Sequence, residues 1–195
     1  QNSDGTYSVP SAETIISTVR NNILVSEAES RGIEVSDDEM DQFAESMLGS
    51  SDYATLATQY GVTEDQAKEI VRERALIQKL YSQVVPEAST ATAPTEPTAP
   101  ENGDTSTSSA EYAQYIIGLA GDEWDSENNT WASTDGSYYL ALGDAFTGDT
   151  ATYEQAVTAY YVAYQEYSNQ MSGYTTTWTD FANGLFANAN IRLYG

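Results

Sequence analysis

Residues 32–85 decide the fold: GIEVSDDEMDQFAESMLGSSDYATLATQYGVTEDQAKEIVRERALIQKLYSQVV. Ser36 stands three residues before Glu39, and Thr63 stands three residues before Gln66. This is the spacing of a capping box, in which each side chain satisfies a free backbone N–H of the other residue. A glycine follows each of the first two apolar runs and a proline follows the third, and both residue types end helices. The stretch therefore predicts three consecutive helices.

Apolar residues recur at intervals of three and four in each predicted helix, so they share one face of it. In the first two helices this face is formed by Met40, Phe43, Ala44, Met47, Leu48, Tyr53, Leu56, Ala57 and Tyr60. In the third it is formed by Ala67, Ile70, Val71, Arg74, Ile77, Leu80, Tyr81 and Val84. Upstream, a polar lead-in covers residues 1–10, and Ser11 is the predicted N-cap of a helix that continues to residue 31.

Residues from about 12 to 85 resemble the N-terminal chaperone domain shared by SurA-like periplasmic chaperones and PrsA-like foldases. The matching residues are Gly32, Ile33, Val35, Ser36, Asp37, Glu39, Gly61, Val62, Arg72, Ile77, Gln78, Lys79 and Leu80. The resemblance implies that the helix ending at residue 31 packs against the long helix over residues 64–85. It also implies helical arms that leave an apolar cradle for unfolded segments.

Six residues of the apolar faces are the predicted peptide-binding residues: Met40, Phe43, Met47, Tyr53, Leu56 and Tyr60. Methionine-rich surfaces adapt to varied partners, as a chaperone requires. The alternative is that these residues are simply the core of a three-helix cluster. The two interpretations are compatible if residues of the core also form one side of the cradle.

Residues 86–109 read PEASTATAPTEPTAPENGDTSTSS and contain no large apolar residue. Such a segment buries too little surface to offset its ordering entropy, so we expect an extended linker. In SurA- and PrsA-like proteins a parvulin prolyl isomerase follows at about this point. Residues 110–195 contain no histidine, whereas parvulin active sites carry histidines, so we expect no parvulin domain here.

The second half reads as helical instead. Apolar spacing predicts helices over 111–119 and 138–146, a third from Tyr153 to Met171 ended by Gly173, and a last one over 178–186. No stretch shows a convincing strand alternation. The predicted fold class is all-α: a SurA-N-like helical cluster over 11–85, the linker, and a second small helical domain over 110–195.

Composition narrows the function classes. The chain has no cysteine and no histidine, which removes thiol catalysis and the commonest general base and metal ligand. We therefore expect no enzyme and no cofactor. A net charge of −23 repels nucleic acid, and no apolar run is long enough to span a membrane. The second half lacks lysine, which excludes a P-loop there and ATP-driven action with it.

The acidic loop over residues 122–129 is the best candidate for a calcium site, since clustered oxygen ligands suit Ca²⁺. Its spacing does not fit an EF-hand, and a solvated acidic loop is the favoured interpretation. Asp37, Asp38 and Glu39 are interpreted as compensating a helix dipole rather than as catalytic carboxylates.

Aromatic residues concentrate in the second half, where 11 of the 15 tyrosines and all three tryptophans lie. Tyrosine is enriched at recognition surfaces, but these rings also serve to fill a core poor in leucine. The favoured interpretation places the tyrosines of the 153–171 helix in the core. Trp124, Trp131, Tyr139 and Tyr161 are expected to be more accessible.

The chain opens at Gln1 without methionine, which together with the resemblance favours an exported protein over an arbitrary boundary. A lipoprotein anchored upstream of Gln1 is one form of such a protein. The predicted function is ATP-independent holding of unfolded or extended polypeptides outside the cytoplasm. One alternative is a cell-surface carbohydrate- or protein-binding module that uses exposed Tyr and Trp. Another is a structural surface protein, including a homodimer that exchanges helices across the linker.

Overall fold

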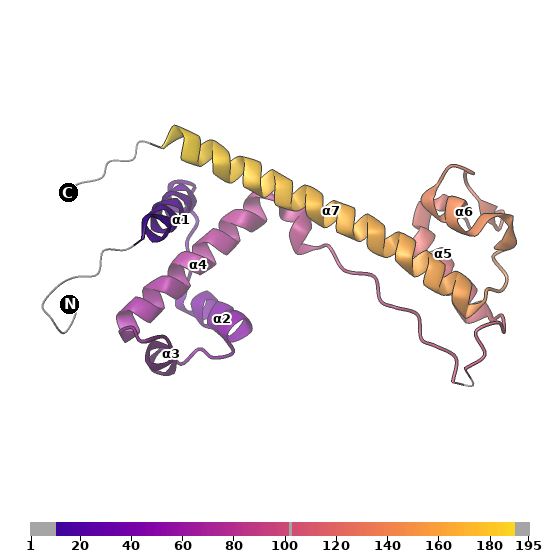
Figure 1. The fold of residues 1–195 in the computed structure, drawn as a ribbon, viewed down its shortest axis with the longest axis horizontal. Coiled ribbons are helices and arrows are strands. Elements are labelled where there is room, and N and C mark those ends of the chain that lie inside the picture. Colours follow the sequence, from indigo (N-terminus) through magenta and orange to yellow (C-terminus); the bar gives the residue numbers. More distant parts are fainter. Residues whose placement is uncertain (1–10, 102, 190–195) are drawn as a thin grey trace, which may run out of the picture. The chain divides into compact units, whose positions relative to one another are not determined.

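The computed structural model describes residues 11–101 and 103–189 (Figure 1). Over these residues the protein is mostly helical, with one two-stranded sheet, which confirms the predicted all-α class. The chain forms two compact units. The first contains the described residues up to 89 and those from 175 onward, and the second contains residues 90–174.

The first unit is built from four helices and the end of a fifth. They are α1 (Ala12–Ser30), α2 (Asp37–Leu48), α3 (Tyr53–Tyr60), α4 (Glu64–Val84) and the last turns of α7 (Tyr153–Asn188). A short 3₁₀ helix, η1 (Pro86–Ser89), follows α4. Both predicted capping boxes form, at Ser36/Glu39 and at Thr63/Gln66. The capping boxes in the sequence therefore predict the starts of α2 and α4 correctly.

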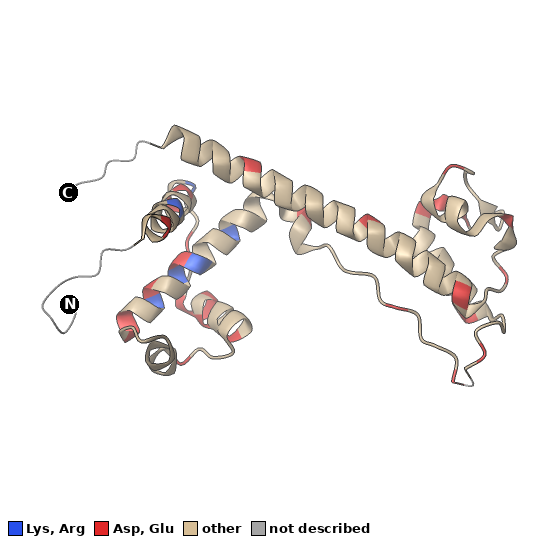
Figure 2. Ribbon diagram, in the orientation of Figure 1, with Lys and Arg blue, Asp and Glu red and all other residues tan. Residues whose placement is uncertain are grey.

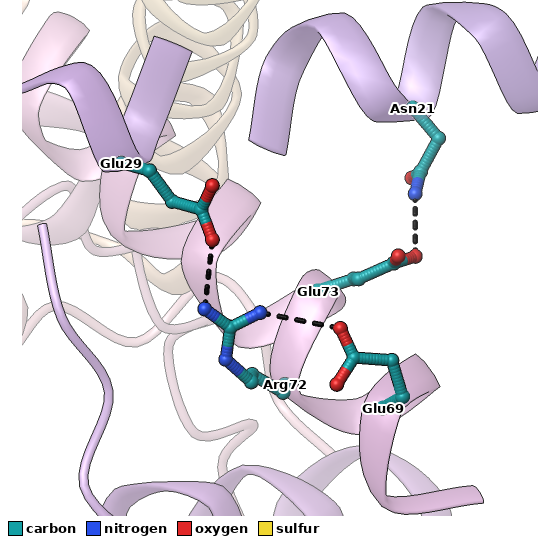
Figure 3. Close-up of polar contacts among 5 residues, drawn as sticks. All are labelled: Asn21, Glu29, Glu69, Arg72 and Glu73. Atoms are coloured by element: carbon teal, nitrogen blue, oxygen red, sulfur yellow. Dashed lines mark hydrogen bonds and ion pairs between the residues drawn. The ribbon is translucent and has the colours of Figure 1, made fainter. Parts of the chain in front are cut away.

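Helix α1 packs on α4 through an apolar core and a polar seam. The core consists of buried Ala28, Leu76 and Leu80. In the seam, Asn21 Nδ2 donates to Glu73 Oε2 at 2.7 Å (Figure 3). Arg72 bridges Glu29 of α1 at 2.8 Å and Glu69 of its own helix at 3.2 Å. The packing of these two helices agrees with the expectation from the resemblance.

The end of α7 completes this core. Trp178 meets the ring of Tyr81 edge-on at 5.3 Å between centroids, and Phe181 packs on the same cluster. The guanidinium groups of Arg31 and Arg20 lie over the rings of Phe181 and Phe186 at 5.0 and 5.2 Å. Residues far from the first four helices in sequence therefore belong to their unit.

The prediction that Gly173 ends a helix is wrong, because α7 runs through it without interruption. A glycine inside a helix costs only about 1 kcal/mol relative to alanine. The aromatic side chains beyond it gain more than this when they pack on the first unit. This packing also moves the boundary of the units away from the ranges expected from sequence, since residues from 175 join the first unit.

The second unit contains the first part of α7. Its other elements are α5 (Ala110–Ala120), η2 (Gly121–Glu123), β1 (Trp124–Asp125), β2 (Thr130–Trp131), α6 (Ser137–Leu142) and η3 (Gly143–Ala145). Its core is formed by Ala113, Ile116, Ala120, Trp124, Tyr138, Leu142, Phe146, Ala151, Ala156 and Ala159.

The sheet was not expected from the sequence. Strands β1 and β2 pair antiparallel, with Trp124 opposite Trp131. Residues 126–129 of the acidic loop form the turn between them, and its first four residues belong to η2 and β1. Asp125 Oδ1 accepts hydrogen bonds from the backbone N–H groups of Glu127 and Asn128, and Asn129 takes a positive φ of 51°. Strands of two residues are too short to show an alternating pattern, which is why no strand is predicted here.

The aromatic expectations for this unit need correction. Small residues of α7, Ala156 and Ala159, face the core, while Tyr164 of the expected core seam is 50% exposed. Conversely, Trp124 was expected to be accessible and is only 5% exposed. Its indole packs against Trp131 at 4.9 Å and against Phe146 at 4.9 Å. Ala156 and Ala159 belong to the same core cluster as Ala113, Ile116 and Ala120 of α5.

The expected linker is in part a packed segment. Residues 90–101 have no helix or strand, yet Pro97 is buried. Ser109 and Ala151 then exchange two backbone hydrogen bonds of 2.9 and 3.0 Å. Tyr112 and Tyr115 of α5 donate hydrogen bonds to carbonyl groups of this segment, and the composition of the segment itself does not reveal these partners.

Candidate functional site

An apolar hollow of about 430 Å³ opens between α2, α3 and α4. It is lined by Phe43, Met47, Leu48, Leu56, Tyr60, Val62, Ala67, Ile70, Val71 and Arg74. We call this set the α2–α4 hollow. All of its lining residues belong to the first unit.

Four of the six predicted peptide-binding residues line the hollow: Phe43, Met47, Leu56 and Tyr60. The other two, Met40 and Tyr53, do not line it. They pack, partly buried, on the core of Ala44, Leu56 and Val71. Leu56 and Phe43 line the hollow and also belong to this core, whereas Met47 and Tyr60 line the hollow alone.

Large apolar side chains around the hollow are open to solvent. Met47 is 66% exposed, Tyr60 57%, Ile70 49% and Leu48 39%. Scattered exposed apolar residues are normal in proteins, whereas a contiguous group around a concave surface marks an interaction site. We call these four exposed residues the rim of the hollow. Ala67 and Val71 of α4 are buried beneath the rim, and their small side chains leave the hollow unfilled.

The contribution of α4 was missing from the predicted site. Ile70 and Arg74 lie one turn apart on the same stripe as Ala67 and Val71, so the sequence placed them on an apolar face. The resemblance implies instead that this helix packs against the helix that ends at residue 31. A signal was present, since an arginine in phase with a helical stripe indicates a face that reaches solvent.

The helices around the hollow are held by capping interactions and one cross-helix lysine. Lys79 Nζ of α4 donates to the carbonyl oxygen of Glu34 at 2.7 Å and pairs with Glu39 Oε1 at 2.6 Å. The lysine lowers the pKa of Glu39, and the backbone N–H of Ser36 adds to this effect. The start of α2 is therefore tied to α4.

Helix α3 is held by its own caps. Asp52 Oδ1 accepts hydrogen bonds from the backbone N–H groups of Ala54 and Thr55 at 3.1 and 3.3 Å. The Thr55 hydroxyl also donates to this carboxylate and lowers the pKa of Asp52. Gly61 closes the helix with φ +69°, a conformation that glycine adopts without strain.

The Tyr53 hydroxyl is buried in the core behind the hollow. Within the described part of the chain it has no hydrogen-bond partner. Burial raises the pKa of Tyr53 to about 12, and the carboxylates of Asp41 and Asp37 contribute to the shift. Lys68 Nζ lies 5.7 Å from the centre of the ring.

Charge is distributed unevenly around the site (Figure 2). All described Lys and Arg residues lie on α1, at its C-cap or on α4. Arg31, Lys68, Arg72 and Lys79 each pair with a glutamate. Arg74 at the hollow forms no ion pair with any residue that the structure describes. Its guanidinium is a set of donors beside an apolar surface.

Neither acidic candidate forms a metal site among the residues that the structure describes, since no group of three or more acidic side chains there could hold an ion. The carboxylate of Asp125 is engaged by its own turn, and its hydrogen bonds with Asn128 lower its pKa. Asp37, Asp38 and Glu39 occupy the first turn of α2, where negative charge favours the helix.

No described helix combines the length and the apolar character needed to cross a membrane. Comparison with known proteins gave no match: no family model fits the chain, and neither a curated protein nor a solved structure is significantly similar to it. The resemblance to SurA- and PrsA-like chaperones therefore remains a prediction.

Proposed function

We propose that this protein is an ATP-independent, extracytoplasmic chaperone-like protein that holds unfolded or extended polypeptides on the α2–α4 hollow. The observation that carries the proposal is the group of exposed Met47, Leu48, Tyr60 and Ile70 around one concave apolar surface. Its volume of about 430 Å³ lies in the range of ligand sites, about 300–1,000 Å³.

The energetics favour weak and unselective holding. Burying one large apolar side chain contributes about 1.5–3 kcal/mol. A dissociation constant of 1 mM corresponds to about 4.1 kcal/mol, so one docked side chain does not hold a client. Two or more apolar side chains of a client must dock together. Release then needs no nucleotide, because each contact is weak and reversible.

Two side chains suit an unfolded client in particular. Met47 is flexible and polarisable, so it packs against side chains of varied shape. Arg74 offers several N–H donors beside the apolar surface, which suits the exposed carbonyl groups of an extended backbone. The net charge of −23 keeps a protein with bound client soluble and attracts clients with basic segments.

The test is suppression of the aggregation of an unfolded client, measured by light scattering with the full chain. Met47→Asp and Ile70→Asp place a charge on the rim at exposed positions, so the fold is expected to persist. We expect both variants to lose most of the suppression. The matched control is Leu140→Asp on α6, which makes the same change at a residue that is 72% exposed and outside the hollow.

Equal suppression by the wild type and both rim variants, with unchanged circular dichroism, contradicts the proposal.

A second candidate function is carbohydrate or protein binding by exposed tyrosines. It is favoured by Tyr161 and Tyr164 of α7, which are 63% and 50% exposed. Binding to a glycan panel without suppression of aggregation supports that candidate instead.

A further inference from the structure

The segment over residues 94–100 repeats proline every third residue, at Pro94, Pro97 and Pro100. We call this segment the strap. A polyproline II helix has three residues per turn, so residues three apart lie on one side of it. The strap has no helix or strand of its own, and Pro97 is buried.

Two tyrosines of α5 bind the strap through its backbone. The Tyr112 hydroxyl donates to the carbonyl oxygen of Thr98 at 2.9 Å, and the Tyr115 hydroxyl donates to that of Thr95 at 2.7 Å. The tyrosines stand three residues apart on one helical face, and the two carbonyls also stand three residues apart. Pro97 lies between these carbonyls in sequence.

These contacts depend on little that is particular to the strap. The carbonyl groups belong to the backbone, and the prolines supply the spacing and the apolar surface. Aromatic grooves that bind proline-rich ligands use the same chemistry. A cavity of about 270 Å³ lies between the strap and α5, lined by Thr95, Glu96, Pro97 and Thr98 on one side and by Glu111, Tyr112 and Tyr115 on the other. The strap therefore does not fill the tyrosine face completely.

We propose that the Tyr112/Tyr115 face is a binding site for proline-rich extended segments of other polypeptides, and that the strap occupies it in cis. The site lies in the second unit and is independent of the α2–α4 hollow.

Charge indicates which ligand binds best. Residues 90–174 contain 13 acidic residues and neither lysine nor arginine, and Glu111 lines the cavity. A second copy of the chain would bring its own net charge of −23 to this surface, so a second copy is disfavoured. A foreign ligand with lysine in place of Glu96 is favoured. The peptide TAPTKPTAP has the proline spacing of the strap and this one change.

The experiment compares the wild type with a strap variant that carries Pro94→Gly, Pro97→Gly and Pro100→Gly in the full chain. Fluorescein-labelled TAPTKPTAP is titrated with each protein and followed by anisotropy. The cis strap competes at an effective concentration in the millimolar range, which lowers the apparent affinity of the wild type. We expect the strap variant to bind about tenfold or more tightly than the wild type.

Two controls locate the binding. Adding Tyr112→Phe and Tyr115→Phe to the strap variant removes both donors and should abolish the gain. The peptide TAGTKGTAG, which lacks prolines at these positions, should bind to neither protein. The proposal is overturned if the strap variant keeps its circular dichroism and shows no saturable binding. It is also overturned if the tyrosine substitutions leave binding unchanged.

If the strap variant loses its helical signal, the wild type is titrated with excess unlabelled peptide and observed by NMR. Shifts of the amide signals of residues 95, 98, 112 and 115 support displacement of the strap, and their absence overturns the proposal. Analytical ultracentrifugation of the wild type tests whether a second copy of the chain occupies the tyrosine face instead. A concentration-dependent dimer without peptide binding assigns the face to a second copy and also overturns the proposal.

Discussion

At the scale of single residues, Tyr53 is the clearest conflict between local chemistry and packing. Its ring packs on the core of Ala44, Leu56 and Val71, while its hydroxyl is buried without a hydrogen-bond partner in the described part of the chain. A buried donor that makes no hydrogen bond costs about 1–3 kcal/mol. The ring gives apolar area at this position. The hydroxyl meets the Asp41 carboxylate, which contributes to its raised pKa, but not in the geometry of a hydrogen bond.

We expect Tyr53→Phe to raise the free energy of unfolding by about 1 kcal/mol, because the substitution removes the buried hydroxyl and keeps the ring. Urea denaturation followed by circular dichroism measures the change. Tyr81→Phe is the control, since Tyr81 packs its ring on Trp178 in the same unit. A loss of stability in Tyr53→Phe would show that the hydroxyl does form a stabilising interaction.

The raised pKa of Tyr53 also predicts that the stability of the fold depends on pH. The folded pKa of Tyr53 is about 12, above its ordinary value of 10.0. The unfolded chain therefore releases this proton first as the pH rises. The free energy of unfolding does not depend on this group below about pH 10, and it falls between about pH 10 and 12. Denaturation curves over this range should show a steeper loss in the wild type than in Tyr53→Phe. Equal slopes contradict the assigned pKa.

At the scale of elements, two glycines have opposite roles. Gly173 lies inside α7, and a Cβ added there meets no atom within 4 Å. Gly148 follows η3 with φ +84°, and a Cβ there would overlap the Trp124 indole and the Asn129 side chain. Gly173 could therefore be replaced by a larger residue without a clash, whereas Gly148 is required by its positive φ and by close packing.

We expect Gly173→Ala to stabilise the protein by about 0.5–1 kcal/mol, since alanine favours the helix and restricts the unfolded chain. Gly148→Ala should destabilise it by more than this, because both the positive φ and the overlap with Trp124 oppose a side chain. Chemical denaturation of both variants gives the two signs. Destabilisation by Gly173→Ala would mean that the continuous helix is not the state in solution.

At the scale of the whole molecule, charge is the dominant long-range feature. The net charge is −23, and residues 90–174 hold 13 acidic residues without a basic one. The ion pairs on α1 and α4 are solvent-exposed, and such pairs contribute about 0–1 kcal/mol each. We expect self-repulsion among the carboxylates to outweigh them.

We expect the melting temperature to rise with salt. The screening length falls from about 30 Å at 0.01 M to about 8 Å at 0.15 M ionic strength, which weakens repulsion between distant carboxylates. Thermal melts in NaCl and in Na₂SO₄ at equal ionic strength separate screening from the additional effect of an excluded salt. A melting temperature that falls with NaCl would show that the exposed ion pairs are the stronger contribution.

The helical class, the capping boxes of α2 and α4, and four of the ten lining residues of the hollow are predictable from the sequence. These features depend on residues close together in the chain. Which side of each stripe faces solvent is not predictable in this way, because exposure depends on how α2, α3 and α4 pack on one another.

Long-range packing also decided three further features. Helix α7 continues through Gly173 because its aromatic end packs on the first unit. The strap is held because Tyr112 and Tyr115 reach its carbonyl groups. Trp124 is buried because two aromatic rings enclose it. In each feature the stabilising partner lies far along the chain, where neither periodicity nor composition reports it.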